Sequence, residues 1–178
     1  MKHIALPDKL EYIGEYCFRE SGLEFISLPP TLKIIGKNAF YLCENLRNVK
    51  FSENLEKIGM YAFFGSGLEN AELPASLRTV SQAAFAKCKS LKTVKFSEGL
   101  EVLGTDELKD GELYYGVFHE SSVEHVELPS TLKRIEYYAF GYCKNLKNIA
   151  LPESLEYIGK YCFWKSRLQT IQIPKTGV

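Results

Sequence analysis

Five cysteines and three histidines are the residues of this 178-residue chain that most readily bind metals or act as nucleophiles. The cysteines are Cys17, Cys43, Cys88, Cys143 and Cys162. No two of them form a Cys-x-x-Cys pair, which is the spacing of zinc and thioredoxin-like sites, and an odd number cannot pair completely in disulfides. A disulfide, metal or redox role therefore ranks below burial of the free thiols, which pack as small apolar side chains.

The segment from His119 to His125, HESSVEH, resembles a metal-binding motif in composition only. Zinc proteases place two histidines four residues apart on one helical face, whereas here the spacing differs and no long helical pattern surrounds them. No serine or cysteine has the neighbours of an activated nucleophile. We therefore expect no enzyme activity, no metal and no cofactor.

A cluster of acidic side chains lies within the segment 104–117. Its members are Asp106, Glu107, Asp110 and Glu112. Their spacing does not match an EF-hand and one loop supplies few ligands, so a calcium site ranks last among the interpretations. A solvated surface loop ranks first, and a loop that contacts a protein partner ranks between the two.

These residues all belong to a repeating unit that accounts for nearly the whole chain. Seven units begin at Leu6, Leu28, Phe51, Leu73, Phe96, Leu128 and Leu151. Each unit has 22 or 23 residues, apart from the fifth, which contains the insertion at about 104–117. A single unit cannot bury its own apolar face, so the copies must stack into a solenoid.

Two kinds of unit alternate along the chain. The long units contain Cys-x-[Asn/Ser]-Leu, and they are residues 28–50, 73–95 and 128–150. The short units have a serine at the corresponding point, and they are residues 6–27, 51–72, 96–127 and 151–172. The period of the structure is therefore a pair of units, about 45 residues long.

Each unit is predicted to contain one strand, a turn and a compact return. The segment 46–51, LRNVKF, alternates apolar and polar residues as a half-buried strand does. Residues 36–43 are predicted to form one or two short helical turns, and Gly22 and Gly67 are predicted to reverse the chain in the left-handed conformation. One phenylalanine per unit is predicted to join an aromatic spine: Phe18, Phe40, Phe63, Phe85, Phe118, Phe140 and Phe163.

The consensus LPxxLxxIGxxAFxxCxxLxxVxL resembles the BspA-type leucine-rich repeat, a class common in bacterial surface proteins, over about residues 1–173. Ser81 and Glu136 depart from it where other units have glycine. The resemblance implies a strand-rich α/β solenoid: a right-handed superhelix with a parallel sheet on the concave side and short helical turns on the return side. It implies a single domain over 1–178, without enzyme activity, that binds macromolecules at a cell surface or after secretion.

Exposed strand positions form columns that run across the units. In the first column the charge alternates until the last position: Lys2, Glu24, Arg47, Glu69, Lys92, Glu124, Lys147 and Gln169. The second column alternates in its middle four positions: Lys50, Glu72, Lys95 and Glu127. Adjacent strands lie about 4.8 Å apart, so these charges either satisfy one another or meet a partner of mixed charge.

The formal net charge of zero disfavours nucleic acid as a partner, and no apolar run approaches the roughly 18 residues that span a bilayer. We therefore expect a protein partner, such as a host or matrix protein. The candidate contact residues are Phe25, Arg47, Asn48, Lys50, Glu72, Lys95, His125, Glu127, Asp106, Glu107, Asp110 and Glu112. The alternative is a structural spacer, or a repeat array that self-associates through its uncapped ends.

Overall fold

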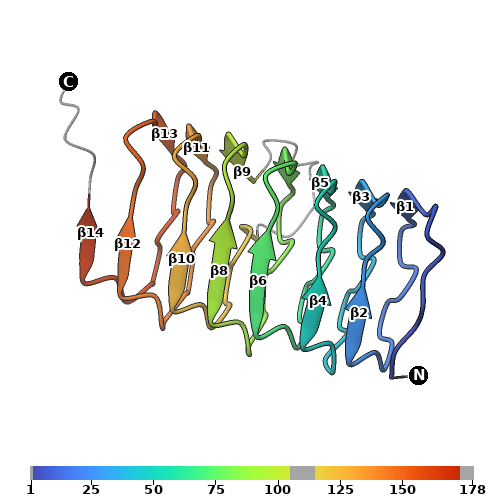
Figure 1. Ribbon diagram of the computed structural model, residues 1–178. Helices are drawn as coiled ribbons and strands as arrows, with labels where there is room; N and C mark the ends of the chain where they lie inside the picture. The colour runs from blue at the N-terminus through green and yellow to red at the C-terminus, as the bar shows by residue number, and fades with distance from the viewer. Residues whose placement is uncertain (1, 105–114, 173–178) are drawn as a thin grey trace.

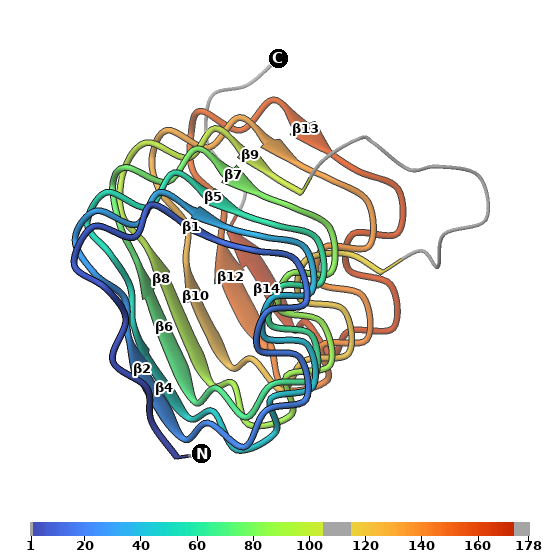
Figure 2. The same ribbon diagram turned by 90° about the vertical axis from the view of Figure 1, so that its right-hand side faces the viewer.

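The computed structural model describes residues 2–104 and 115–172, which form a parallel β-solenoid whose coils follow the order of the chain (Figure 1). Every coil adds one short strand to a continuous sheet and one longer strand to a second side. Viewed from its end, a coil carries long strands on one side, short strands on a second side and a return without strands on the third (Figure 2). The predicted strand-rich leucine-rich-repeat solenoid is confirmed.

The short-strand sheet is continuous and contains seven parallel strands. They are β1 (Tyr12–Ile13), β3 (Ile34–Ile35), β5 (Lys57–Ile58), β7 (Thr79–Val80), β9 (Val102–Leu103), β11 (Arg134–Ile135) and β13 (Tyr157–Ile158). This sheet could not be predicted from the sequence, because two-residue strands are too short to show alternation. The only signal was an apolar residue placed directly before the consensus glycine, as in Ile35–Gly36.

The second side of the coil, here called the long-strand face, carries strands of three or four residues. They are β2 (Phe25–Ser27), β4 (Asn48–Lys50), β6 (Asn70–Leu73), β8 (Thr93–Phe96), β10 (His125–Glu127), β12 (Asn148–Ala150) and β14 (Thr170–Gln172). Hydrogen bonds join them into three groups, β2–β4, β6–β8–β10 and β12–β14, which lie side by side. These are the strands that the alternating pattern predicted.

The return side contains turns, and the prediction of short helical turns is wrong for the described residues. The reason is visible in the amide groups of the first coil. The Arg19 amide donates to a carbonyl three residues back in its own coil, but the Phe18 amide donates to Ala39 of the next coil, at 2.8 Å. A helix would direct every amide to a carbonyl of its own coil, so this alternation excludes one.

Left-handed residues allow this alternation. They stand two positions before and two after the spine phenylalanine, except before Phe118, where Gly116 does not have positive φ. In the second coil they are Asn38 (φ 55°) and Leu42 (φ 52°). The predicted left-handed glycines, Gly22 and Gly67, do not have positive φ, so that prediction is wrong. The reversal occurs two residues earlier, at Glu20 and Gly65.

The aromatic spine forms as predicted and runs through the centre of the solenoid. Successive rings of its seven phenylalanines stack with centroids 5.1–5.6 Å apart and interplanar angles of 3–12°. The five inner rings are fully buried, and burial of each contributes about 1.5–3 kcal/mol. Each coil thus supplies the surface that covers its neighbour, which is why the units need one another.

Candidate partner-binding surface

The strand register brings the predicted columns into line across the long-strand face. Phe25 lies opposite Asn48, and Lys95 lies opposite Glu127. Glu72 pairs with Lys95 from the other side. The side chains at these positions are exposed, whereas the residues between them, such as Ile26 and Val94, point into the core.

Three ion pairs form within the columns, and all of them are exposed. They are Lys2–Glu24 (3.1 Å), Arg47–Glu69 (2.9 Å) and Lys95–Glu127 (3.3 Å). Exposed pairs contribute only about 0–1 kcal/mol each. Many charges of the two columns therefore pair with one another. For Arg47, Lys95 and Glu127, this favours mutual ion pairing over contact with a partner of mixed charge.

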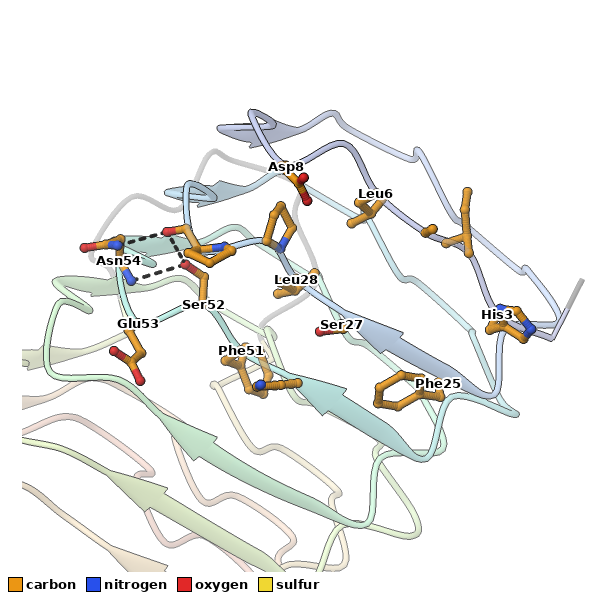
Figure 3. A pocket seen from close by; sticks show the side chains of 15 residues that line it. His3, Leu6, Asp8, Phe25, Ser27, Leu28, Phe51, Ser52, Glu53 and Asn54 are labelled. Atoms are coloured by element: carbon orange, nitrogen blue, oxygen red, sulfur yellow. Dashed lines mark hydrogen bonds between the residues drawn. The ribbon is translucent and has the colours of Figure 1, made fainter.

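Lys50 differs from these residues because it makes no ion pair with any other described residue. It instead borders a groove of about 720 Å³ at the N-terminal end of the long-strand face. The groove lies between residues 3–8, strands β2 and β4, and the turns that follow these strands (Figure 3). A cation without a partner beside a cavity is available to an incoming acidic group.

The groove is mainly apolar. Its apolar lining comprises Ile4, Ala5, Leu6, Phe25, Leu28, Pro29, Pro30 and Phe51. The wall beyond β4 is held in place by one carbonyl. The Pro30 oxygen accepts hydrogen bonds from the Ser52 hydroxyl at 3.0 Å and from the side-chain amide of Asn54 at 2.9 Å (Figure 3). The turn that forms this side of the groove is therefore preorganised.

Phe25 is the aromatic residue that the groove exposes. It is 46% exposed at the start of β2, although its neighbours Leu23 and Ile26 are almost fully buried. Figure 3 shows its ring on the surface of the sheet, with His3 on the adjacent segment. An exposed aromatic ring at the edge of an apolar groove is typical of an anchoring position in a protein interface.

The predicted site residues are spread along the long-strand face. Phe25, Asn48 and Lys50 lie on β2 and β4, but His125 and Glu127 lie on β10, beyond β6 and β8. At about 4.8 Å per strand, β10 is roughly 15 Å from β4. The four acidic candidates, Asp106, Glu107, Asp110 and Glu112, lie outside the described residues.

Sequence reasoning missed the walls of the groove, namely Leu6, Leu28, Phe51 and the Ser52–Asn54 turn. The available signal was the sequence Ser-x-Asn directly after Phe51, because Ser and Asn side chains bond nearby backbone groups in turns. That signal gives no information about which carbonyl accepts the bonds.

A second groove, of about 810 Å³, lies over the short-strand sheet. Its lining includes Tyr12, Ile34, Lys57, Arg78 and Thr79. Lys57 and Arg78 give this groove a more cationic and less apolar wall than the first one has. It supplies a matched comparison, because Tyr12 is 49% exposed and resembles Phe25 in size and exposure.

The cysteines are buried as predicted, with one exception. Cys43, Cys88, Cys143 and Cys162 are buried free thiols, but Cys17 is exposed. It belongs to the first described coil, so none of the described coils covers its outer side. Burial raises the pKa of Cys88 to about 11 and the pKa of Cys143 to about 12, which disfavours the reactive thiolate at neutral pH.

His119 is buried among tyrosine rings on the return side. Its ring centroid lies 5.0 Å from that of Tyr115, 5.7 Å from that of Tyr138 and 5.2 Å from that of Tyr142. Burial is the largest cause that lowers the pKa of His119. Within residues 2–104 and 115–172, no three His, Cys, Asp or Glu residues gather closely enough to hold a metal ion.

The model of the BspA-type leucine-rich repeat region matches residues 11–115 and 111–178. The chain belongs to the BspA-type leucine-rich repeat family. No curated protein matches the sequence. Leucine-rich repeat families are in general protein-interaction modules and are typically not enzymes.

Solved structures of bacterial leucine-rich repeat proteins resemble this BspA-type solenoid. A protein from Bacteroides ovatus is 29% identical, with a TM-score of 0.81 over 98% of this chain and 43% of its own. A leucine-rich cell surface protein from Faecalibacterium prausnitzii is 24% identical, with a TM-score of 0.68 over 96% of this chain and 47% of its own. This chain therefore spans less than half the length of either relative. Among the described residues, no helix is long and apolar enough to cross a bilayer.

Proposed function

We propose that this BspA-type protein is a binding module without enzyme activity that captures a protein partner on its long-strand face. The observation that carries the proposal is the exposed Phe25 ring at the edge of the apolar groove. Membership in a family of interaction modules supports a protein ligand. The cell-surface description of the Faecalibacterium relative supports placing the module outside the cell, where a host or matrix protein would be the partner.

The groove specifies the chemistry of the partner segment. Phe25 and the residues around it accept an apolar side chain, and Lys50 accepts a carboxylate. Lys50 lies one strand away from Phe25 and two residues further along the strand direction. Strand geometry places these two positions about 8 Å apart. The partner is therefore an exposed segment with an aromatic or aliphatic side chain and an acidic residue at roughly that separation.

The other exposed residues of the long-strand face add contacts around the groove in this proposal. Glu72, Lys95 and Glu127 continue the column from Lys50 and extend contact along the face, with Asn48 and His125 in the neighbouring column. The four acidic residues of the insertion adjust specificity. Replacement of Lys50, Glu72 and Lys95 together is expected to weaken binding without unfolding the protein, because all three side chains lie on the exposed face.

The test uses a random peptide library displayed on phage and selected against the full chain. Phe25→Ser removes the anchor and Lys50→Glu reverses the charge, whereas Tyr12→Ser removes an equally exposed aromatic residue from the second groove. We expect peptides that combine an apolar residue with a nearby acidic residue. Their retention should fall at least about tenfold on the first two variants, which corresponds to loss of an interface anchor.

Two results would contradict the proposal. The first is peptide retention that survives Phe25→Ser but is lost with Tyr12→Ser, which would assign binding to the second groove. The second is selected sequences without any apolar or acidic preference. Circular dichroism of each variant serves as the folding control, since exposed substitutions away from packed residues usually change stability by less than about 0.5 kcal/mol.

A further inference from the structure

The C-terminal end of the described solenoid exposes positions that are buried or half-buried in the earlier coils. Ile158 is 45% exposed, whereas the equivalent residues from Ile13 to Ile135 are at most 2% exposed. Ile171 is 40% exposed, against 4% for the equivalent Ile149. The ring of Phe163 stacks on Phe140 on one side only. The coil 151–172 therefore presents a surface of the kind that another coil covers elsewhere.

At this end the backbone also has strand edges and amide groups that, in earlier coils, bond to the next coil. Strands β13 and β14 each have one neighbour, β11 and β12. In the preceding coil, alternate return amides donate to the next coil, as Phe140 does to the Cys162 carbonyl at 2.8 Å. The corresponding amides of Tyr161, Phe163 and Lys165 donate to no carbonyl within the described ranges.

Ser166 indicates which kind of coil fits. In each earlier short coil the equivalent serine hydroxyl lies 3.4–3.6 Å from a cysteine of the following long coil: Ser21–Cys43, Ser66–Cys88 and Ser121–Cys143. The thiol also donates to the carbonyl of the preceding spine phenylalanine, at 2.9–3.0 Å. In the last described coil the Ser166 hydroxyl donates to the Phe163 carbonyl itself, at 2.8 Å.

A third column of charged side chains also indicates that a long coil fits. It occupies the residue directly before each short strand and alternates throughout: Glu11, Lys33, Glu56, Arg78, Glu101, Lys133 and Glu156. Its ion pairs include Lys33–Glu11 at 3.4 Å and Lys133–Glu101 at 3.1 Å. Glu156 has no ion pair among the described residues, so a cation on the next coil would continue the alternation.

We propose that the C-terminal end of this solenoid is a docking face for a leucine-rich coil of the long type. That coil carries a cysteine three residues after its spine phenylalanine and a cation directly before its short strand. The first coil of a second copy does not fit, because it is a short coil and would place Glu11 against Glu156 and Ser21 against Ser166. This proposal does not depend on the groove around Phe25.

The test extends the full chain with matched coils copied from itself. In one variant, residues 173–178 are replaced by a copy of the long unit 28–50, which brings the copies of Lys33 and Cys43 against Glu156 and Ser166. In the control variant they are replaced by a copy of the short unit 51–72, which brings copies of Glu56 and Ser66 instead. The two additions differ in length by one residue.

We expect the long copy to raise the thermal midpoint by about 5 °C or more, because an added coil contributes an interface of packed core residues. The amides of Tyr161, Phe163 and Lys165 should then become protected from hydrogen exchange. The short copy should give less than about half of that rise. In the long-copy variant, Glu156→Lys should lower the midpoint, and changing the copied lysine to glutamate as well should restore it.

Equal stabilisation by the two copies would overturn the proposal, because the end face would then not distinguish the coil types. Unprotected amides in the long-copy variant would overturn it too, since the coil would not have docked. Sedimentation of the unmodified chain at high concentration should show a monomer. A head-to-tail assembly there would contradict the exclusion of a second copy.

Discussion

Cys88 donates its thiol hydrogen to the Phe63 carbonyl of the preceding coil, 3.0 Å away, and its sulfur lies 3.4 Å from the Ser66 hydroxyl. The same contact recurs at Cys43 and Cys143 but not in the coils between them. It joins each long coil to the short coil before it. The alternation of unit types in the sequence therefore corresponds to an alternation of coil interfaces in the solenoid.

Replacement of Cys88 by alanine should destabilise the protein by about 1–3 kcal/mol. The substitution removes a buried sulfur, leaves the Ser66 hydroxyl without its thiol partner and removes one of the two hydrogen bonds that the Phe63 carbonyl accepts. Chemical denaturation measures the change. Cys17→Ala is the matched control, because Cys17 is exposed, and it should cost less than about 0.5 kcal/mol. Equal effects of the two substitutions would show that the interface contact contributes nothing.

The native protein should contain a single fast-reacting thiol. Burial raises the pKa of Cys88 to about 11 and of both Cys143 and Cys162 to about 12, so these thiols are almost fully protonated at pH 8. Burial also raises the pKa of Cys43. Alkylation followed by mass spectrometry should label Cys17 first, and the other four should react only after unfolding. Rapid labelling of Cys43 without denaturant would contradict the described packing.

The solenoid could be predicted from the sequence because the same apolar positions recur seven times, and stacking is the only way to bury them. The helical turns could not be excluded, because the choice depends on whether the Phe18 amide bonds within its coil or across to Ala39. Spacing alone carries no information about that choice. The candidate site was predicted in part: Phe25 and Lys50 were identified, but the turn that walls their groove depends on the Pro30 carbonyl, which no motif identifies.

The free energy of unfolding should decrease as the pH falls below 7, partly because His119 becomes protonated. Its pKa is lowered mainly by burial, and also by Lys87 and Lys89, while Glu120 opposes the shift. The unfolded chain therefore takes up a proton at a higher pH than the folded chain does. This contribution to stability is complete above the ordinary histidine pKa of about 6.5 and is lost as the pH falls through the lowered value.

The His119 contribution can be isolated by substitution. The free energy of unfolding of the wild type should decrease between pH 7.5 and 5 more than that of His119→Phe, which keeps a ring among the tyrosines but cannot be protonated. His119→Gln provides a second variant if the larger ring is not accommodated. Identical pH dependence in the wild type and both variants would rule out a buried neutral histidine.

The ion pair between Arg47 and Glu69 should contribute little to stability. Its atoms lie 2.9 Å apart, but the side chains are 63% and 44% exposed. A double-mutant cycle with Arg47→Ala and Glu69→Ala should give a coupling of about 0–1 kcal/mol that decreases with added salt. A coupling above about 2 kcal/mol would indicate that the charged columns are a major source of stability. A smaller coupling agrees with a role mainly in setting the strand register.

The most direct test of the proposed binding function is the affinity of one selected peptide for three forms of the protein. Fluorescence polarisation of the labelled peptide would be measured with the wild type, Phe25→Ser and Tyr12→Ser. We expect Phe25→Ser to raise the dissociation constant at least about tenfold and Tyr12→Ser to leave it within about twofold. Equal affinity for the wild type and Phe25→Ser would contradict the assignment of the long-strand groove as the binding site.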